Sequence, residues 1–425
     1  MAKSFFAAVS IDTLKNLRQL VSSFSKPSWT PGSGSGSIAV LSKSRLDSQW
    51  STWAKALPTV KPYYAVKCNP DPFLLKNLID KGAHFDCASL REVHDVRASK
   101  IAYDMPQPEI LYAHPLKSER DIRVIGENQI QTTVVDSFEE CIKLTLSEWK
   151  GNALVRIAVN DKHSKMPFSA KFGATEKELD EIARHSLIPL TGISFHVGSG
   201  CENPLQYKDA IEYAAETGFA ILRKYSHEPK IVDIGGGFSS DPVSFAETAK
   251  VIQDTLTRVP KNRIMIAEPG RFFAQPSQDL FVKVIAKKKG PNGLRYVIDE
   301  SLYGHFSSIP FDHQKPAFIR IPHQGADLTE RVVKEAILFG RTCDSLDVIA
   351  KGPMEELVVG DWLYFPLMGA YTSATASEFN GFPKPDLLYD TSDLLPTVEE
   401  AWDLTREFHR TNATLKFSNA LQPIV

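Results

Sequence analysis

The sequence lacks several features that would point to particular protein classes. No window approaches about 18 uncharged apolar residues, the length that a helix needs to cross a membrane. The net charge is only -2 and the pI is near 6.6, so there is no strong field to attract nucleic acid or an anionic membrane. We therefore expect a soluble protein with a small-molecule partner, without nucleic acid and without a membrane.

Cysteine is also scarce. The five residues Cys68, Cys87, Cys141, Cys201 and Cys343 are odd in number, widely scattered, and form neither a CxxC pair nor a zinc spacing. This pattern indicates a reducing compartment and no metal site. Residues 1–21 carry charges and lack an unbroken apolar core, so they do not form a secretory signal. We expect a cytoplasmic protein.

The composition is that of a globular protein, and 425 residues suggest two domains. Residues 10–24 place leucines at helical spacing after Ser10, a plausible N-cap, and predict a short amphipathic helix. The alternation of glycine and serine over Gly32–Ser37 is typical of a flexible linker. We assign residues 1–37 to this helix and linker.

From residue 38 to about 286, short apolar strands alternate with helix-length stretches. The predicted strands are Pro62–Val66, His84–Cys87, Ile110–Ala113, Thr133–Asp136, Ala153–Ala158, Gly192–His196, Ile231–Ile234 and Arg263–Ala267. The alternation alone also fits a doubly wound open sheet, but the count of eight favours an α/β fold of the (β/α)₈ TIM-like barrel type. Residues 287–425 show apolar runs without helical crossovers. They predict a C-terminal, mostly β domain with a late helix over Pro396–His409.

Polar residues follow several of the predicted strands, where a barrel carries its functional groups. They are Lys67, Asp86, Arg156, His196, the run Gly235–Gly237 and the run Glu268–Arg271. A lone lysine after a strand usually extends its charge to solvent. Six polar strand ends in register describe a single pocket, in which Lys67 has to be paired, deprotonated or bound as a Schiff base.

Two of these runs predict a phosphate site. Gly235, Gly236 and Gly237 allow backbone N–H groups to approach an anion closely, although a glycine triplet alone is usually a turn. One strand later, Gly270 and Arg271 add a second glycine and a guanidinium suited to phosphate. The last two strands of a barrel often carry such a site.

A lysine able to form a Schiff base, together with a phosphate site, suggests pyridoxal 5'-phosphate (PLP). This cofactor needs an acid opposite its ring nitrogen, and Glu268 is placed for that role. His196 can present its imidazole to the ring face, with Ser199 reaching the phosphate. An isolated histidine at a strand end is as often structural.

Several longer motifs carry a family resemblance. From about residue 38 the sequence resembles the eukaryotic ornithine decarboxylases, which are alanine-racemase-like (fold type III) PLP enzymes, with Phe311–Gln314 closest to the fungal branch. The matching stretches are Tyr64–Asn69, Phe85–Ser89, Phe195–Cys201, Asp233–Phe238, Ala267–Arg271, Phe311–Gln314, Thr342–Asp347 and Met368–Thr372.

The resemblance implies a PLP-dependent amino acid decarboxylase that converts L-ornithine to putrescine and CO₂. Lys67 would bind the cofactor covalently, Glu268 its ring nitrogen and His196 its ring face. Phosphate would be bound by Ser199, Gly235, Gly236, Gly237, Gly270, Arg271 and Tyr371, while Asp86 and Arg156 would line the cofactor site.

The resemblance also implies a head-to-tail homodimer with active sites shared between subunits. Cys343 from the other subunit would return a proton to the substrate's α-carbon, and Asp344 with Asp312 would bind the distal ammonium. Phe379 would lie in the substrate pocket, and Lys171 would pair with Asp347 across the dimer. Two nearby aspartates make sense where a diamino acid brings a second cation, because without one they would repel.

Some neighbours of these motifs depart from the family pattern. Arg341 replaces a usual proline, Ser307–Ser308 an Asn-Cys pair, Leu367 an asparagine, and His305 a small residue. Arg341 could bind a carboxylate on a larger substrate, so the alternative is decarboxylation of an N-substituted diamino acid, as in fungal alkaloid (loline-type) biosynthesis. Lysine, arginine or neutral drift around an unchanged pocket are also open.

A further alternative is a non-enzyme, because the family includes antizyme inhibitors, which bind a regulatory protein without catalysis. Such proteins typically lose cofactor or catalytic residues. Here Lys67, His196, Glu268, Cys343 and Asp344 are all present, which favours an enzyme.

Overall fold

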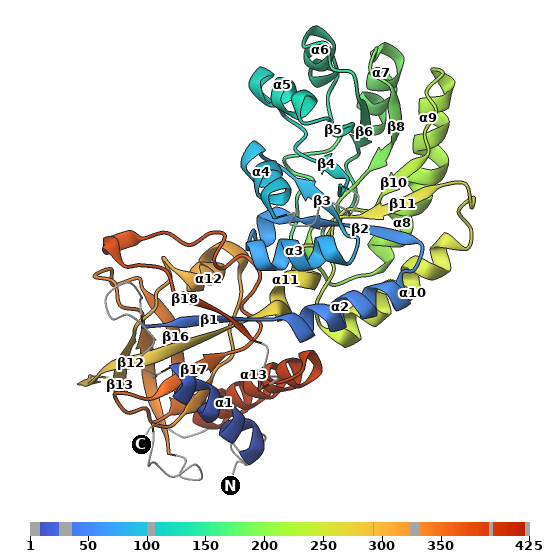
Figure 1. Ribbon diagram of the computed structural model, residues 1–425. Coiled ribbons are helices and arrows are strands. Elements are labelled where there is room, and N and C mark those ends of the chain that lie inside the picture. The colour runs from blue at the N-terminus through green and yellow to red at the C-terminus, as the bar shows by residue number, and fades with distance from the viewer. Residues whose placement is uncertain are drawn as a thin grey trace. The chain divides into compact units, whose positions relative to one another are not determined.

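The computed structural model describes residues 9–24, 36–99, 107–291, 293–323, 332–390 and 394–420, without the side chains of 414–420. The chain forms two compact units (Figure 1). One runs from Gln49 to Phe273. The other combines the residues up to Ser48 with those from Ala274 onward. Among the described residues, no helix is both long enough and apolar enough to span a membrane.

The unit Gln49–Phe273 is built on a closed barrel of eight parallel strands (Figure 1). In order around the barrel they are β10 (Ile231–Asp233), β11 (Ile264–Ala267), β2 (Val60–Ala65), β3 (His84–Cys87), β4 (Ile110–Tyr112), β5 (Thr132–Val135), β6 (Asn152–Arg156) and β8 (Leu190–Ser194). Strand β8 pairs with both β6 and β10, which closes the barrel. Every predicted strand falls on one of these eight, so the barrel is confirmed and the open sheet is excluded.

Helices follow the strands, and six of them begin at residues with short polar side chains. Ser118 and Asp121 form a reciprocal capping box, with the Ser118 N–H donating to Asp121 Oδ2 at 2.9 Å, and Thr175 with Glu178 forms another. The helices are α2 (Lys43–Ala56), α3 (Pro72–Asp80), α4 (Leu90–Ala98), α5 (Glu119–Glu127), α6 (Phe138–Leu146), α7 (Glu176–His185), α8 (Leu205–Tyr213), α9 (Phe219–Lys224) and α10 (Pro242–Leu256). A small sheet joins β7 (Ser164–Met166) and β9 (Ser199–Cys201).

The second unit is mostly β, as predicted. Its sheet runs in the order β14 (Ile319–Ile321), β17 (Trp362–Phe365), β12 (Gln278–Gly290), β13 (Gly293–Ile298), β15 (Val333–Phe339) and β16 (Val348–Glu355), while β1 (Ile38–Ser42) pairs with β12 and β18 (Asp386–Asp390). Its helices are α1 (Ile11–Phe24), α12 (Ser308–Asp312) and α13 (Val398–Ala420), and α11 (Arg271–Ser277) crosses into it from the barrel unit. The predicted late helix corresponds to α13.

The predicted domain boundaries at 37/38 and 286/287 differ from the compact units. Strand β1 pairs in parallel with β18 and antiparallel with β12, so the residues after position 37 join the β unit. Arg45 strengthens this assignment through a buried ion pair, its Nη1 lying 2.8 Å from Asp279 Oδ1. Strand β12, which begins at Gln278, also belongs to the β unit rather than to the barrel.

The predicted N-terminal helix is confirmed as α1, and Ser10 caps it by accepting the Thr13 N–H at 2.9 Å. Its apolar face, which includes Leu17, packs in one cluster with Phe281 and Tyr364 of the β unit. Most of the predicted linker, residues 32–35, lies outside the described residues.

Candidate active site

Lys67 lies in the short 3₁₀ turn Val66–Cys68 that directly follows β2. Its Nζ lies 2.9 Å from Oδ2 of Asp86, a buried residue in the neighbouring strand β3. The lysine side chain itself is 44% exposed, so its amine is accessible to a ligand. The second oxygen, Asp86 Oδ1, is buried and has no hydrogen-bond partner among the described residues. The lysine is therefore paired, as expected, while it stays open on the side of the barrel mouth.

His196 follows β8, and its Nδ1 accepts the N–H of Gly198 at 2.9 Å, which leaves the ring proton on Nε2. Burial lowers the pKa of His196 well below its ordinary value, and the positive charges of Arg156 and Lys67 lower it further. The ring of Phe168 stands edge-on to the imidazole, with 4.9 Å between centroids. His196 is thus a neutral, fixed, flat ring.

Glu268 follows β11 and is buried. Burial raises the pKa of Glu268 well above its ordinary value, and the nearby carboxyl groups of Asp233 and Asp86 raise it further. Burial also raises the pKa of Asp233 to about 6. These surroundings favour the protonated form of Glu268, whereas a cationic ligand group beside it would favour the carboxylate.

Gly235–Gly237 form a backbone cradle after β10. Gly235 and Gly237 have positive backbone φ values of 64° and 100°, which residues with a side chain rarely adopt. A Cβ on Gly236 would lie 2.8 Å from Nε2 of His196, so any side chain there would fill the space in front of the imidazole. Tyr207 fixes the cradle by donating its hydroxyl to the Gly236 carbonyl at 2.7 Å.

The two predicted phosphate side chains meet beside this cradle. Arg271 Nη2 donates to Ser199 Oγ at 3.2 Å, although the residues are 72 positions apart in sequence. A Cβ on Gly270 would lie 3.0 Å from the Cβ of Cys68, so the glycine allows close packing behind Lys67. The barrel unit thus brings together the predicted lysine, imidazole, acid and anion-binding groups.

Arg156 ends β6, and its guanidinium stands 5.1 Å from the ring centroid of Phe172. Phe168 and Phe172 come from one turn, so one segment covers both His196 and Arg156. These rings and Asp233 had no role predicted from the sequence. An acid inside the apolar run Ile231–Ile234 was the available signal for Asp233; the two phenylalanines carry no local signal.

The remaining predicted residues belong to the β unit. Cys343 is exposed, and its N–H donates to Asn380 Oδ1 at 3.0 Å. Asp344 accepts hydrogen bonds from the hydroxyl of Tyr303 and from the Leu346 N–H, and the latter bond lowers the pKa of Asp344 most.

The other two predicted substrate residues of this unit are also held in place. Asp312 is buried and accepts the amide of Gln314 at 2.9 Å. The Phe379 ring stacks on Tyr303 at 4.3 Å. Tyr371, predicted to bind phosphate, has a left-handed backbone with φ of 54°.

The Arg341 side chain binds groups of its own β unit. Its Nη2 donates to the Pro383 carbonyl at 2.6 Å and lies 3.9 Å from the buried Glu300 carboxylate, and its guanidinium stacks on Phe382 at 4.6 Å. These contacts account for an arginine at this position without a carboxylate on the substrate.

The other departures from the family pattern are buried too. The Ser307 hydroxyl lies 2.7 Å from that of Thr375, and His305 is fully enclosed. Asp347 accepts three hydrogen bonds from Leu302 and Thr342 of its own unit, so its predicted pairing with Lys171 gains no support.

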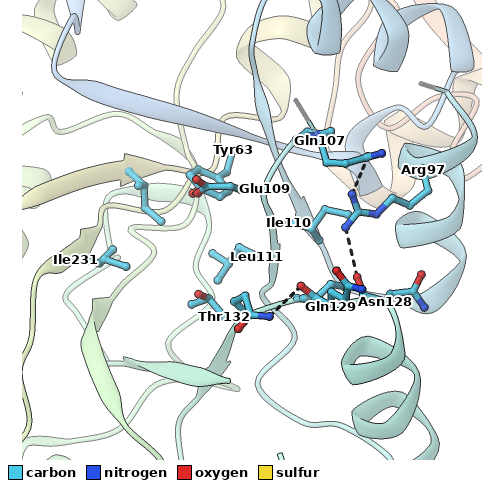
Figure 2. A pocket seen from close by; sticks show the side chains of 14 residues that line it. Tyr63, Arg97, Gln107, Glu109, Ile110, Leu111, Asn128, Gln129, Thr132 and Ile231 are labelled. Atoms are coloured by element: carbon cyan, nitrogen blue, oxygen red, sulfur yellow. Dashed lines mark hydrogen bonds between the residues drawn. The ribbon is translucent and has the colours of Figure 1, made fainter. Parts of the chain in front are cut away.

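A cavity of about 640 Å³ lies at the other end of the barrel (Figure 2). Its walls include Ile110, Thr132 and Ile231, which begin their strands, and the Tyr63 hydroxyl donates to Glu109 Oε2 there at 2.5 Å. Conserved chemistry in barrels of this kind is built at the carboxyl ends of the strands. The cavity is therefore not part of the candidate active site.

An accessible lysine, a neutral imidazole, a buried acid and a glycine run in one parallel barrel define a pyridoxal-phosphate type of enzyme site. Residues 43–275, more than half of the chain, match the family described as pyridoxal-dependent decarboxylase, pyridoxal binding domain. The chain belongs to this family.

Relatives and solved structures agree with this assignment. The chain is 38% identical over 359 residues to the ornithine decarboxylase of Schizosaccharomyces pombe, covering 81% of each chain. It is 37% identical to antizyme inhibitor 2 of Xenopus laevis, over 79% of this chain and 76% of that protein. Its fold is similar to the arginine decarboxylase of Paramecium bursaria Chlorella virus, with a TM-score of 0.80 and 32% identity, covering 89% of this chain and all of that one.

Proposed function

We propose that the protein decarboxylates L-ornithine to putrescine and CO₂ with PLP as its cofactor, in the cytoplasm. The observation that carries the proposal is the buried acid Glu268 beside Asp233, at the same end of the barrel as Lys67, where burial and the neighbouring carboxyl groups raise the pKa of Glu268. In this proposal Glu268 would face the pyridine nitrogen of the cofactor. Ornithine decarboxylases at 34–38% identity support the choice of substrate.

The residues of the barrel fit the cofactor. At Gly235–Gly237 a Cβ would meet neighbouring atoms at 2.2–2.8 Å, so the run has to stay bare backbone, whose N–H groups could bind an anion together with Arg271 and Ser199. Asp86 orients the Lys67 amine, and its buried oxygen Oδ1 has no donor within the part of the chain that the structure describes. When bound, PLP supplies an electron sink that allows CO₂ to leave the α-carbon of an amino acid.

The chain's own residues would supply the rest of the chemistry. Lys67 would bind the cofactor and be displaced by the substrate amine. Glu268 would hold a proton at the ring nitrogen, and the neutral His196 can lie against the ring without adding a competing positive charge.

The β unit would complete the site from a second copy of the chain, in a homodimer with shared active sites. The exposed Cys343 would return the proton to the α-carbon as a general acid. Asp312 and Asp344 would bind the distal ammonium, and Asp344 is ionised for this role because the Leu346 N–H and the Tyr303 hydroxyl lower its pKa. Phe379 would line the pocket.

A larger, carboxylate-bearing substrate is not favoured. That hypothesis needed Arg341 as a carboxylate ligand, and the guanidinium is already bonded to Pro383 and lies near Glu300. The role of an antizyme inhibitor is not favoured either, because Lys67, Glu268 and Cys343 are all retained in the sequence.

The test is CO₂ release by the PLP-loaded protein. We expect brisk turnover of L-ornithine and weaker turnover of L-lysine, L-arginine and N-carboxyalkyl diamino acids. Cys343→Ala and Lys67→Ala serve as inactive controls. Turnover of a carboxylate-bearing analogue but not of ornithine would refute the substrate, and a protein that cannot take up PLP would refute the enzyme.

A further inference from the structure

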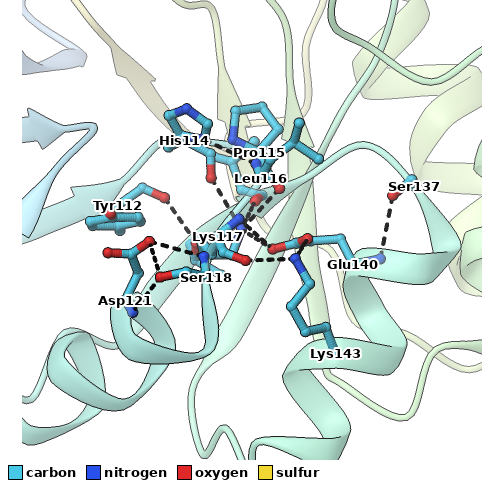
Figure 3. A network of polar contacts seen from close by, with 12 residues as sticks. Tyr112, His114, Pro115, Leu116, Lys117, Ser118, Asp121, Ser137, Glu140 and Lys143 are labelled. Atoms are coloured by element: carbon cyan, nitrogen blue, oxygen red, sulfur yellow. Dashed lines mark hydrogen bonds and ion pairs between the residues drawn. The ribbon is translucent and has the colours of Figure 1, made fainter.

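Lys117 is a buried cation in the loop between β4 and α5, at the carboxyl end of the barrel (Figure 3). Its side chain has no exposed surface. Its Nζ lies 2.8 Å from the Val134 carbonyl, 3.1 Å from the carbonyls of His114 and Pro115, and 3.1 Å from Glu140 Oε1. The ammonium therefore ties its own loop to the end of β5.

Glu140 completes this network from α6. Its Oε1 also accepts the Lys117 N–H at 2.9 Å, and its Oε2 accepts Lys143 Nζ at 2.6 Å. Burial of an ion pair is costly, and the pair by itself contributes little to stability. The groups that Lys117 binds suggest that the pair has a different role.

Two connections lead from Lys117 to the turn that carries Phe172. The His114 ring, oriented by the Leu116 N–H that donates to its Nδ1 at 3.1 Å, stands edge-on to Phe172 at 6.2 Å. The second connection runs through β5, because Lys117 binds the Val134 carbonyl of this strand. The chain continues from β5 to Asp136, whose Oδ2 accepts the Gly173 N–H at 3.0 Å. Both routes end beside the ring on which Arg156 stacks.

We propose that Lys117 is a positioning residue for the cofactor site: by clamping the 114–118 loop to β5, it fixes Phe172 and thereby Arg156. The same turn carries Phe168, which packs on His196. The inference rests on the proposed role of Arg156 in holding PLP. It adds a residue that touches neither cofactor nor substrate.

The experiment measures PLP affinity of the full-length apoprotein by fluorescence titration, alongside urea unfolding. Lys117→Met leaves Glu140 buried without its cation, so the paired variant Lys117→Met/Glu140→Leu is included to recover stability. We expect both to bind PLP about 10-fold more weakly or worse, since misplacement of a supporting group has effects of this size. Lys143→Met removes a charge beside Glu140 and one bond to the Lys117 carbonyl, at 2.6 Å, but leaves every bond of the Lys117 ammonium to His114 and Val134 in place. It is the matched control and should stay within about 2-fold.

A double-mutant cycle separates positioning from general stabilisation. Phe172→Leu should weaken PLP binding, and adding Lys117→Met/Glu140→Leu should weaken it little further, because both act through one contact. If the Lys117 variants fail to fold, His114→Ala can replace them in the cycle with Phe172→Leu, because it leaves the buried ion pair of Lys117 and Glu140 intact. Additive losses, or wild-type affinity in the paired variant, would overturn the inference. A wild-type protein without PLP affinity would instead overturn the proposed function.

Discussion

Glu268 and Asp233 share a hydrogen bond inside the barrel, and this bond requires a proton on one of the two carboxyl groups. The residues stand on neighbouring strands, and Asp233 also accepts the Gly235 N–H at 2.9 Å and the Ser194 hydroxyl at 3.1 Å. The acid expected at the cofactor's ring nitrogen is therefore linked to the glycine cradle expected at its phosphate.

This relationship predicts different effects of two similar substitutions. Glu268→Gln should lower kcat/KM by about 100-fold or more, because an amide cannot develop the charge that balances a protonated ring nitrogen. Asp233→Asn is the matched control: its amide can still accept from Gly235, and we expect a loss below about 10-fold. Steady-state kinetics decide, and equal losses in the two variants would contradict a special role for Glu268.

Active sites shared between two copies predict recovery of activity by mixing. Lys67→Ala and Cys343→Ala should each be inactive, because each removes one group from both sites. When the two are unfolded together and refolded at equal amounts, half of the dimers are mixed and each holds one intact site, so about a quarter of wild-type activity should return. Co-refolding of Lys67→Ala with itself is the control, and absence of recovery would place both residues of a site on one chain.

The raised pKa of Asp299 predicts that the stability of the protein depends on pH. Burial raises its pKa to about 7 from an ordinary value of 3.8, although its Oδ1 accepts the Lys283 N–H. The folded protein therefore binds a proton that the unfolded chain has lost, and the resulting stability is present below about pH 4 and lost as the pH rises to about 7.

Asp299→Asn keeps the hydrogen-bond acceptor but does not ionise, so its free energy of unfolding should equal that of the wild type near pH 4. Above pH 7 the variant should be more stable than the wild type by on the order of 2–4 kcal/mol in the free energy of unfolding. Urea unfolding across this range measures the difference. A constant offset between the two proteins would show that Asp299 does not titrate there.

Arg341 should matter for stability rather than for substrate choice. Arg341→Met removes the cation near the buried Glu300 and the bond to the Pro383 carbonyl, so we expect a loss of about 1–3 kcal/mol in the free energy of unfolding. The ratio of ornithine turnover to that of a carboxylate-bearing analogue should stay unchanged. A ratio that shifts toward ornithine would restore Arg341 as a substrate ligand.

The barrel could be predicted because its strands are short β-branched or aromatic runs set between helix-length segments, a local pattern visible around Tyr64 or Val134. The positions of Lys67, His196 and Glu268 at strand ends follow from the same pattern. The roles of Phe168, Phe172 and Lys117 could not be predicted, because they depend on which side chains meet after the chain has closed on itself.

The compact units differ from the predicted domain boundaries for a related reason. Nothing near Ile38 in sequence shows that its partners are Phe281 and Asp386. Likewise, Arg45 finds its counter-ion 234 residues later. Local patterns report the conformation of a segment, while such long-range pairings are decided by the finished core.

The pairing of β1 between β12 and β18 has a consequence for the synthesis of the chain. The residues from Gln49 to Phe273 can complete their closed barrel as they leave the ribosome, whereas β1, made earlier, has one edge open until β12 has been made and the other until Asp390 has been added. An apolar strand that waits for some 350 residues is exposed to pairing with other chains. Nascent copies of this protein should therefore depend on a chaperone that shields their first forty or so residues.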